Sequence, residues 1–229
     1  MVMLDPAKGG QVFISGKKGS GKSVMARRLF DTYPYDRIVL DVTGDLSRDF
    51  KRDGIKFTRL DPHALPLRFP SGGDDGPVTL VLVPDMGDED EAVAQMDRCI
   101  GLAMTHRRTL VWSDETGVLS RAGRTPPNLR RALHHGRHSQ LFLMLAGPRA
   151  MAVDPLCISQ ADVVMTFKTP SPADRKRIAD NIGWPPQRFD AAVHALGQYE
   201  YLMYDSNGQD DELLHMPPLP RSDDYDLTA

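Results

Sequence analysis

The sequence predicts an α/β fold, a three-layer sandwich with a mostly parallel central sheet. Two observations predict it. Short apolar segments of five to seven residues alternate with longer segments of helical pattern along the 229-residue chain, as expected for parallel strands joined by helices. The first apolar segment also leads directly into a glycine-rich loop that is followed by a helical pattern. The length allows one large core, and a second full domain would be cramped.

Six apolar segments are predicted to be strands, and a seventh is expected at the sheet edge or as the returning strand of a hairpin. The six cover residues 11–15, 37–41, 78–83, 109–114, 140–146 and 162–167, and the seventh covers 198–204. Helices are predicted at 21–31, 88–106, 127–136, 172–182 and 187–195. Residues 70–77, with glycine, proline and aspartate, predict a loop.

Composition limits the classes of protein that fit. Residues 1–204 are expected to form one domain, and residues 205–229 a flexible tail, because the tail is acidic and contains prolines. The net charge of −3 argues against a generally basic surface, so any nucleic-acid contact must come from a local patch. Two cysteines and the absence of a long apolar run or signal peptide predict a cytoplasmic protein with reduced thiols and no membrane span.

Residues 16–23, "GKKGSGKS", match the phosphate-binding pattern G-x-x-x-x-G-K-[ST] between a predicted strand and a predicted helix. Backbone amides at the start of such a helix point at phosphate groups, and glycines permit the close approach. Lys22 is expected to reach the β- and γ-phosphates of ATP, and the Ser23 hydroxyl to hold Mg²⁺. A chance glycine-rich turn is the alternative. The predicted nucleotide-binding residues are Gly16, Lys17, Lys18, Gly19, Ser20, Gly21, Lys22, Ser23 and Val24.

A second motif, "TLVWSDET" at residues 109–116, ends a predicted strand with two carboxylates. Ligands of parallel sheets bind at the carboxyl ends of the strands. Asp114 is therefore expected to hold Mg²⁺, through water, and Glu115 to activate a water for attack on the γ-phosphate. The alternative is a solvated acidic strand end. Together with the phosphate loop, the motif favours ATP hydrolysis over transfer to a small acceptor.

The order of these motifs resembles the FtsK–HerA superfamily of ring-forming, DNA-pumping ATPases, which includes small viral genome-packaging NTPases. The segment "DVTGDL" keeps Asp41, Gly44 and Asp45 of the motif that often follows the second strand in that family. The resemblance spans roughly residues 10–182 in motif order. It implies a P-loop NTPase of the RecA/ASCE-like type, with ATP and Mg²⁺ as ligands.

One motif departs from the family pattern. Where the family has a glutamine that senses the γ-phosphate, "AGPRA" has Pro148, followed by the expected Arg149. Proline has no side-chain donor, so the sensor function is in doubt or has moved, with Ser113 and Thr116 as candidates.

The resemblance also implies a homo-oligomeric ring, a hexamer or pentamer, in which an arginine of one subunit completes the site of its neighbour. Arg137, the preferred candidate, and Arg149 could supply it, and the alternatives are a helix-end cation and a structural ion pair. The compact length favours a viral packaging ATPase, with a capsid or portal vertex as partner, located in the host cytoplasm or with the virion. The rival interpretations are a conjugation or defence ATPase of the same superfamily and a nucleotide-dependent assembly or switch protein.

Double-stranded DNA is the expected polymer partner. Residues 116–153 contain no Asp or Glu, and a local cluster of arginines attracts phosphate backbones irrespective of base sequence. Alternatively, these arginines lie around a solvated helix or pair with the acidic tail or a neighbouring subunit. The predicted DNA contacts are Arg121, Arg124, Arg130 and Arg131.

Overall fold

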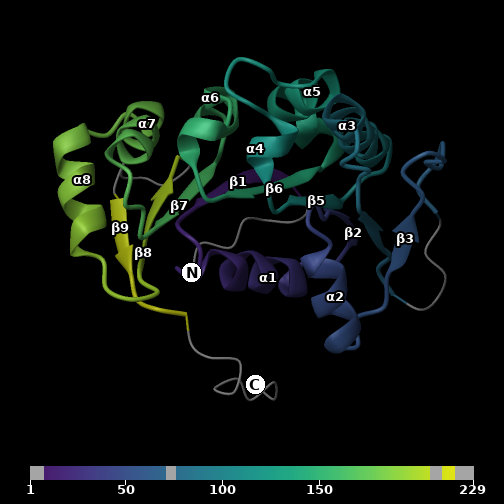
Figure 1. Cartoon of the computed structure of the whole chain (residues 1–229), viewed down its shortest axis with the longest axis horizontal. Helices are drawn as coiled ribbons and strands as arrows, with labels where there is room; N and C mark the ends of the chain where they lie inside the picture. The colour runs from purple at the N-terminus through teal and green to yellow at the C-terminus, as the bar shows by residue number, and fades with distance from the viewer. Residues whose placement is uncertain (1–7, 71–75, 207–212, 220–229) are drawn as a thin grey trace.

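The computed structural model describes residues 8–70, 76–206 and 213–219, and within these residues nine strands form one sheet (Figure 1). From β3 to β7 all neighbouring strands are parallel, and β8 and β9 continue the sheet antiparallel to their neighbours. In sheet order the strands are β3 (Thr58–Leu60), β4 (Thr79–Leu82), β2 (Asp36–Leu40), β5 (Thr109–Ser113), β6 (Phe142–Gly147), β1 (Gly10–Ser15), β7 (Val163–Phe167), β8 (Tyr201–Asp205) and β9 (Leu213–Met216).

Helices cover both faces of the sheet (Figure 1). One face carries α1 (Lys22–Thr32) and α2 (Asp45–Arg52). The other carries α3 (Glu89–Thr105), α4 (Thr116–Leu119), α5 (Pro127–His135), α6 (Pro155–Ser159), α7 (Pro172–Ile182) and α8 (Pro186–Ala195). Two short 3₁₀ segments, η1 (Gly136–Ser139) and η2 (Ala150–Ala152), flank β6.

Each face of the sheet has its own hydrophobic core. Along β1, Val12 and Ile14 belong to the core beneath α1 and α2, whereas Phe13 belongs to the core beneath α3 to α8. This alternation follows from the two-residue period of a strand. In the first core, Trp112 is fully buried between aromatic rings, 5.6 Å from Phe30 by ring centroids. The predicted three-layer α/β sandwich is confirmed.

The six predicted inner strands correspond to β1, β2, β4, β5, β6 and β7, and the seventh segment returns as β8, antiparallel to β7. The sheet continues past the expected boundary at residues 204 and 205. Strand β8 ends at Asp205, and Leu213–Met216 forms β9, which pairs with β8 from Tyr201 to Tyr204. Residues 207–212 and 220–229 of the expected flexible tail lie outside the described residues. Among the described helices, none is long and apolar enough to cross a membrane.

Candidate functional site

The sheet register places the phosphate-binding loop between the ends of three strands. Ser15, the last residue of β1, lies opposite Gly147 of β6 and Thr166 of β7. The loop follows at once, and α1 begins at Lys22 without a side-chain cap on its first amides. Uncapped amides at a helix start are donors for an anion. The loop therefore lies where the sequence predicts it, at the carboxyl edge of the sheet.

The loop approaches β7 so closely that only glycine fits at its first position. A Cβ atom on Gly16 would lie 2.6 Å from the Cβ of Phe167 and 2.6 Å from the Oγ of Ser20. The Lys17 amide donates to the carbonyl oxygen of Lys168 over 3.0 Å, which ties the loop to the end of β7. Gly21, at φ 106°, adopts a left-handed conformation in which other residues are strained.

The remaining predicted loop residues differ in their exposure. Lys17, Lys18 and Gly19 are exposed, as are Ser23 and Val24 at the start of α1. Ser20 is buried, and within the described residues its hydroxyl has no hydrogen-bond partner. Because most of these loop residues face solvent, the backbone amides of the loop are accessible to a ligand.

The two acidic residues follow β5 at the same edge of the sheet. Ser113 pairs in register with Leu40 of β2, so Asp114 lies beside Asp41, which follows β2. Asp41 is buried and its carboxylate accepts from the Ser47 amide over 2.8 Å, so it holds the start of α2. The Oδ1 atom of Asp114 is buried, and no donor of the described residues reaches it.

Electrostatics link Asp114 and Glu115 to the phosphate loop. Burial raises the pKa of Asp114; the charge of Lys22 opposes this, and the charges of Asp41 and Asp45 add to it. Burial also raises the pKa of Glu115, again opposed by Lys22, and the charge of Asp114 adds to the increase. The structure thus brings Lys22, Asp114 and Glu115 together. A buried carboxylate oxygen without a donor, beside a lysine and a serine-bearing loop, fits a hard cation such as Mg²⁺.

The two candidates for the displaced sensor differ in their hydrogen bonding. The Ser113 hydroxyl is buried without a partner among the described residues. The Thr116 hydroxyl donates to the Ser113 carbonyl oxygen over 3.4 Å. Within the described residues Ser113 therefore keeps an unpaired hydroxyl, directly before Asp114 in the chain, which makes it the better candidate of the two.

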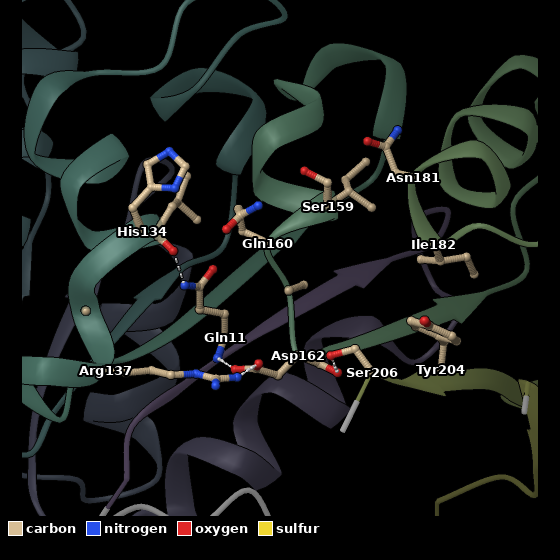
Figure 2. A pocket seen from close by; sticks show the side chains of 14 residues that line it. Gln11, His134, Arg137, Ser159, Gln160, Asp162, Asn181, Ile182, Tyr204 and Ser206 are labelled. Atoms are coloured by element: carbon tan, nitrogen blue, oxygen red, sulfur yellow. Dashed lines mark hydrogen bonds and ion pairs between the residues drawn. The ribbon is translucent and has the colours of Figure 1, made fainter. Parts of the chain in front are cut away.

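The two predicted trans-acting arginines both form ion pairs within the chain. Arg149 donates through Nε to Asp174 Oδ2 over 2.8 Å, and the Asp174 side chain is almost fully buried. Arg137 pairs with Asp162, whose second oxygen accepts from the Gln11 amide over 2.8 Å (Figure 2). The Arg149 pair matches the structural ion pair that the sequence left open as an alternative role for this residue.

The two arginines lie at opposite edges of the sheet. Arg137 is in η1, which precedes β6, and Asp162 precedes β7, so this pair is at the amino edge, in the wall of a cavity of about 370 Å³ (Figure 2). Arg149 follows β6, so it is at the carboxyl edge with the phosphate loop. The structure does not bring Arg137 to the phosphate loop of its own chain.

Two of the four predicted DNA contacts are paired with the start of α3. Arg121 forms an ion pair with Glu89, and Arg124 Nη1 lies 3.0 Å from Asp90 Oδ1. The sequence suggested the acidic tail or a neighbouring subunit as partners, and the acidic partners instead come from the first turn of α3. Arg130 donates to the Thr125 carbonyl oxygen over 3.4 Å. Arg131 is exposed on α5.

Sequence reasoning missed a cavity of about 330 Å³ that adjoins the phosphate loop. Its walls combine Lys17, Gly19 and Ser20 of that loop with Lys168 and residues 196–199. Lys168 directly follows β7, whereas residues 196–199 belong to the connection that returns from α8 to β8, far along the chain. No local motif marks this connection, because only the antiparallel pairing of β7 and β8 places it beside the loop.

Comparison with solved structures identifies the fold. No model of a protein family matches the sequence, and no curated protein matches it. The structure is similar to the genome packaging NTPase B204 from Sulfolobus turreted icosahedral virus 2 in complex with AMPPCP, at a TM-score of 0.66 and 21% identity, covering 94% of this chain and 100% of that one. It is also similar to VirB4 of Thermoanaerobacter pseudethanolicus, at a TM-score of 0.67 and 12% identity, covering 96% and 94%.

A third similar structure is the pCW3 conjugation coupling protein TcpA with ATPγS, at a TM-score of 0.53 and 13% identity, covering 93% of this chain and 61% of that one. All three likenesses extend over nearly the whole of the present chain. The chain therefore has the P-loop ATPase fold shared by the viral packaging NTPase B204 and these two proteins, and the expected resemblance is confirmed at the level of fold.

Proposed function

We propose that this chain is a Mg²⁺-dependent ATPase that moves or packages double-stranded DNA as a homo-oligomeric ring, a hexamer or a pentamer. The observation that carries the proposal is the juxtaposition of Lys22, Asp114 and Glu115 beside the open, glycine-rich loop. Similar folds carry ATP-like ligands: structures of B204 contain AMPPCP and ATPγS. The structure is also similar to B204 of Sulfolobus Turreted Icosahedral Virus, the DNA-packaging ATPase of that virus, which favours DNA as the polymer.

The residues of the site divide the work of hydrolysis. Loop amides and Lys22 bind the β- and γ-phosphates, while Ser23 and Asp114 hold the cation. Bound Mg²⁺ would neutralise charge on the phosphate oxygens. Glu115 takes a proton from the attacking water as the bond to the leaving ADP breaks, and a raised pKa makes a carboxylate a stronger base. Ser113 is the candidate donor to the γ-phosphate.

DNA binding is proposed for the arginines of the connection between α4 and α5. This connection starts five residues after Glu115, after the single turn of α4, so nucleotide state has a short path to it. Arg121, Glu89, Arg124 and Asp90 are all at least 47% exposed. Exposed ion pairs contribute only about 0.2–1 kcal/mol each, so phosphates of DNA can displace the two carboxylates.

A variant with Glu89→Gln and Asp90→Asn tests the DNA contact. Loss of two competing carboxylates should tighten duplex binding by about fivefold, which corresponds to about 1 kcal/mol in total. The control is Asp180→Asn, which neutralises an exposed acid paired with Lys176 on α7. Fluorescence anisotropy at several salt concentrations measures the affinities. Equal tightening in both variants would show that overall charge, and not the arginine connection, governs binding.

Arg137 remains the proposed trans-acting group, since its side chain is 57% exposed and lies at the edge opposite its own phosphate loop.

The direct test of the whole proposal is phosphate release with and without duplex DNA over a range of protein concentrations. Turnover that rises with both DNA and concentration supports a ring-forming motor. ATP binding without DNA-stimulated turnover would favour the switch protein. The conjugation-type alternative is supported by the likeness to VirB4 and TcpA, and a capsid or portal partner belongs to the packaging version.

A further inference from the structure

A cavity adjoins the phosphate loop, and phosphates bound to the loop would not fill it. Its volume of about 330 Å³ lies within the range of about 300–1,000 Å³ usual for small-molecule sites. One wall is the phosphate loop, through Lys17, Gly19 and Ser20, and the other is the connection from α8 to β8. In Figure 1 this connection passes beside the start of α1. A ligand with its phosphates on the loop would extend into this cavity with its opposite end.

Tyr199 presents an aromatic ring at this cavity. The residue is 46% exposed, so its ring is accessible to a ligand. Its Cδ1 atom lies 3.6 Å from the point that a Cβ atom on Gly21 would occupy, so the ring stands against the loop that binds phosphate. Its φ of 66° is in the left-handed region, which is unfavourable for a bulky residue. Such conformations persist where surrounding contacts impose them, often at ligand sites.

Contacts on both sides of Tyr199 hold the connection in place. The Glu200 carboxylate accepts from the Gly197 amide over 2.7 Å and lies 2.8 Å from Nε2 of His215 in β9. Lys168, at the end of β7, donates through Nζ to the Leu196 carbonyl oxygen over 2.7 Å. The ring is thus positioned before a ligand arrives, which lowers the entropy cost of binding.

We propose that this cavity is the base-and-ribose subsite of the bound nucleotide and that the ring of Tyr199 is the platform on which the base stacks. The inference rests on the proposed function, because it assumes that phosphates occupy the neighbouring loop. Stacking on an aromatic ring suits any nucleobase. Ser20, whose buried hydroxyl has no partner in the part of the chain that the structure describes, lines the junction between the loop and the cavity and can bond an oxygen of the ligand there. Gln198, next to Tyr199 in the lining, adds an amide that can bond the edge of the base.

The test compares ATP with tripolyphosphate, which has the phosphates and lacks base and ribose. Calorimetry measures the affinity of both ligands, with Mg²⁺, for the wild type, Tyr199→Gly and Tyr199→Phe. Glycine adopts a φ of 66° without strain, so Tyr199→Gly removes the ring and should melt no lower than the wild type. We expect it to bind ATP about tenfold more weakly, in line with the loss of one stacked base, and to bind tripolyphosphate as the wild type does. Tyr199→Phe should retain ATP affinity.

The matched control is Gln140→Gly, which relieves a φ of 54° just before β6, at the amino edge of the sheet. It should leave ATP affinity unchanged. Unaltered ATP affinity in Tyr199→Gly, or an equal loss for both ligands, would overturn the subsite while leaving the phosphate loop intact. A wild type that binds neither ligand would instead contradict the proposed function itself.

Discussion

Replacing Gly16 with alanine should displace the phosphate loop and lower Tm, because the added Cβ atom clashes with β7. The new Cβ would lie 2.6 Å from the Cβ of Phe167. Phe167 cannot retreat, because it is fully buried and its ring stacks on Tyr201 with centroids 5.1 Å apart. Overpacking of this kind costs about 1–3 kcal/mol. At about 2–4 °C per kcal/mol for a domain of this size, Tm should fall by roughly 2–12 °C. The loop, which is more exposed, is the part that must move.

That movement should also weaken ATP binding, since the amides of the loop lose their alignment. Differential scanning fluorimetry gives the Tm, and calorimetry gives the affinity for ATP. Gly123→Ala is the control: Gly123 has a φ of 79° and no atom within 4 Å of an added Cβ, so it incurs backbone strain away from the loop. Its Tm should fall by a few degrees with ATP affinity unchanged. If Gly16→Ala bound ATP with wild-type affinity, the alignment of the loop amides would not determine phosphate binding.

Three further predictions concern buried groups. In Mg²⁺-free buffer at pH 7, Asp114→Asn should raise Tm, because burial raises the pKa of Asp114 and its ionised form therefore destabilises the folded state above that pKa. This gain in Tm should vanish below about pH 3.9, where the carboxyl group is protonated in the unfolded state as well. A gain that persists below that pH would exclude the charge of Asp114 as its cause. The thiols of Cys99 and Cys157 should resist a thiol reagent at pH 8 until the protein unfolds, because burial raises the pKa of both to about 12; rapid labelling of the native protein would contradict their burial. Arg149→Ala should lower stability by about 1–2 kcal/mol in denaturant unfolding, because the Asp174 carboxylate then keeps only the Met151 amide as a donor among the described residues outside its own helix. Arg131→Ala should change stability by less than about 0.5 kcal/mol, and equal effects of the two variants would contradict the structural role of Arg149.

The parts of the site that local sequence could predict are those that are continuous in the chain. The phosphate loop, with the strand before it and the helix after it, is one stretch, and Asp114 and Glu115 end a strand of buried residues. In contrast, β9 was missed because its four residues lie in an acidic, proline-bearing segment. It forms a strand by pairing with β8, and that pairing is not visible in the sequence of the segment itself. The same limit applies to Tyr199, since nothing in its own neighbourhood indicates contact with Gly21.

Charge pattern was a weaker guide than motif spacing. The absence of acids over residues 116–153 correctly marked an arginine-rich segment, but it could not show that Glu89 and Asp90 lie across from Arg121 and Arg124. Those contacts arise from the packing of α3 against the connection after α4. Arg137 and Arg149, in contrast, flank a strand that the sequence did predict, β6, so their separation to opposite edges of the sheet could be predicted.

The central claim is that Glu115 activates water for cleavage of a triphosphate held by the loop at the start of α1. The most direct measurement is phosphate release by Glu115→Gln beside its ATP affinity, with duplex DNA present and the wild type in parallel. We expect Glu115→Gln to bind ATP as the wild type does and to release phosphate about 10²–10⁴-fold more slowly, the usual contribution of a general base. Turnover at the wild-type rate in Glu115→Gln would contradict the claim.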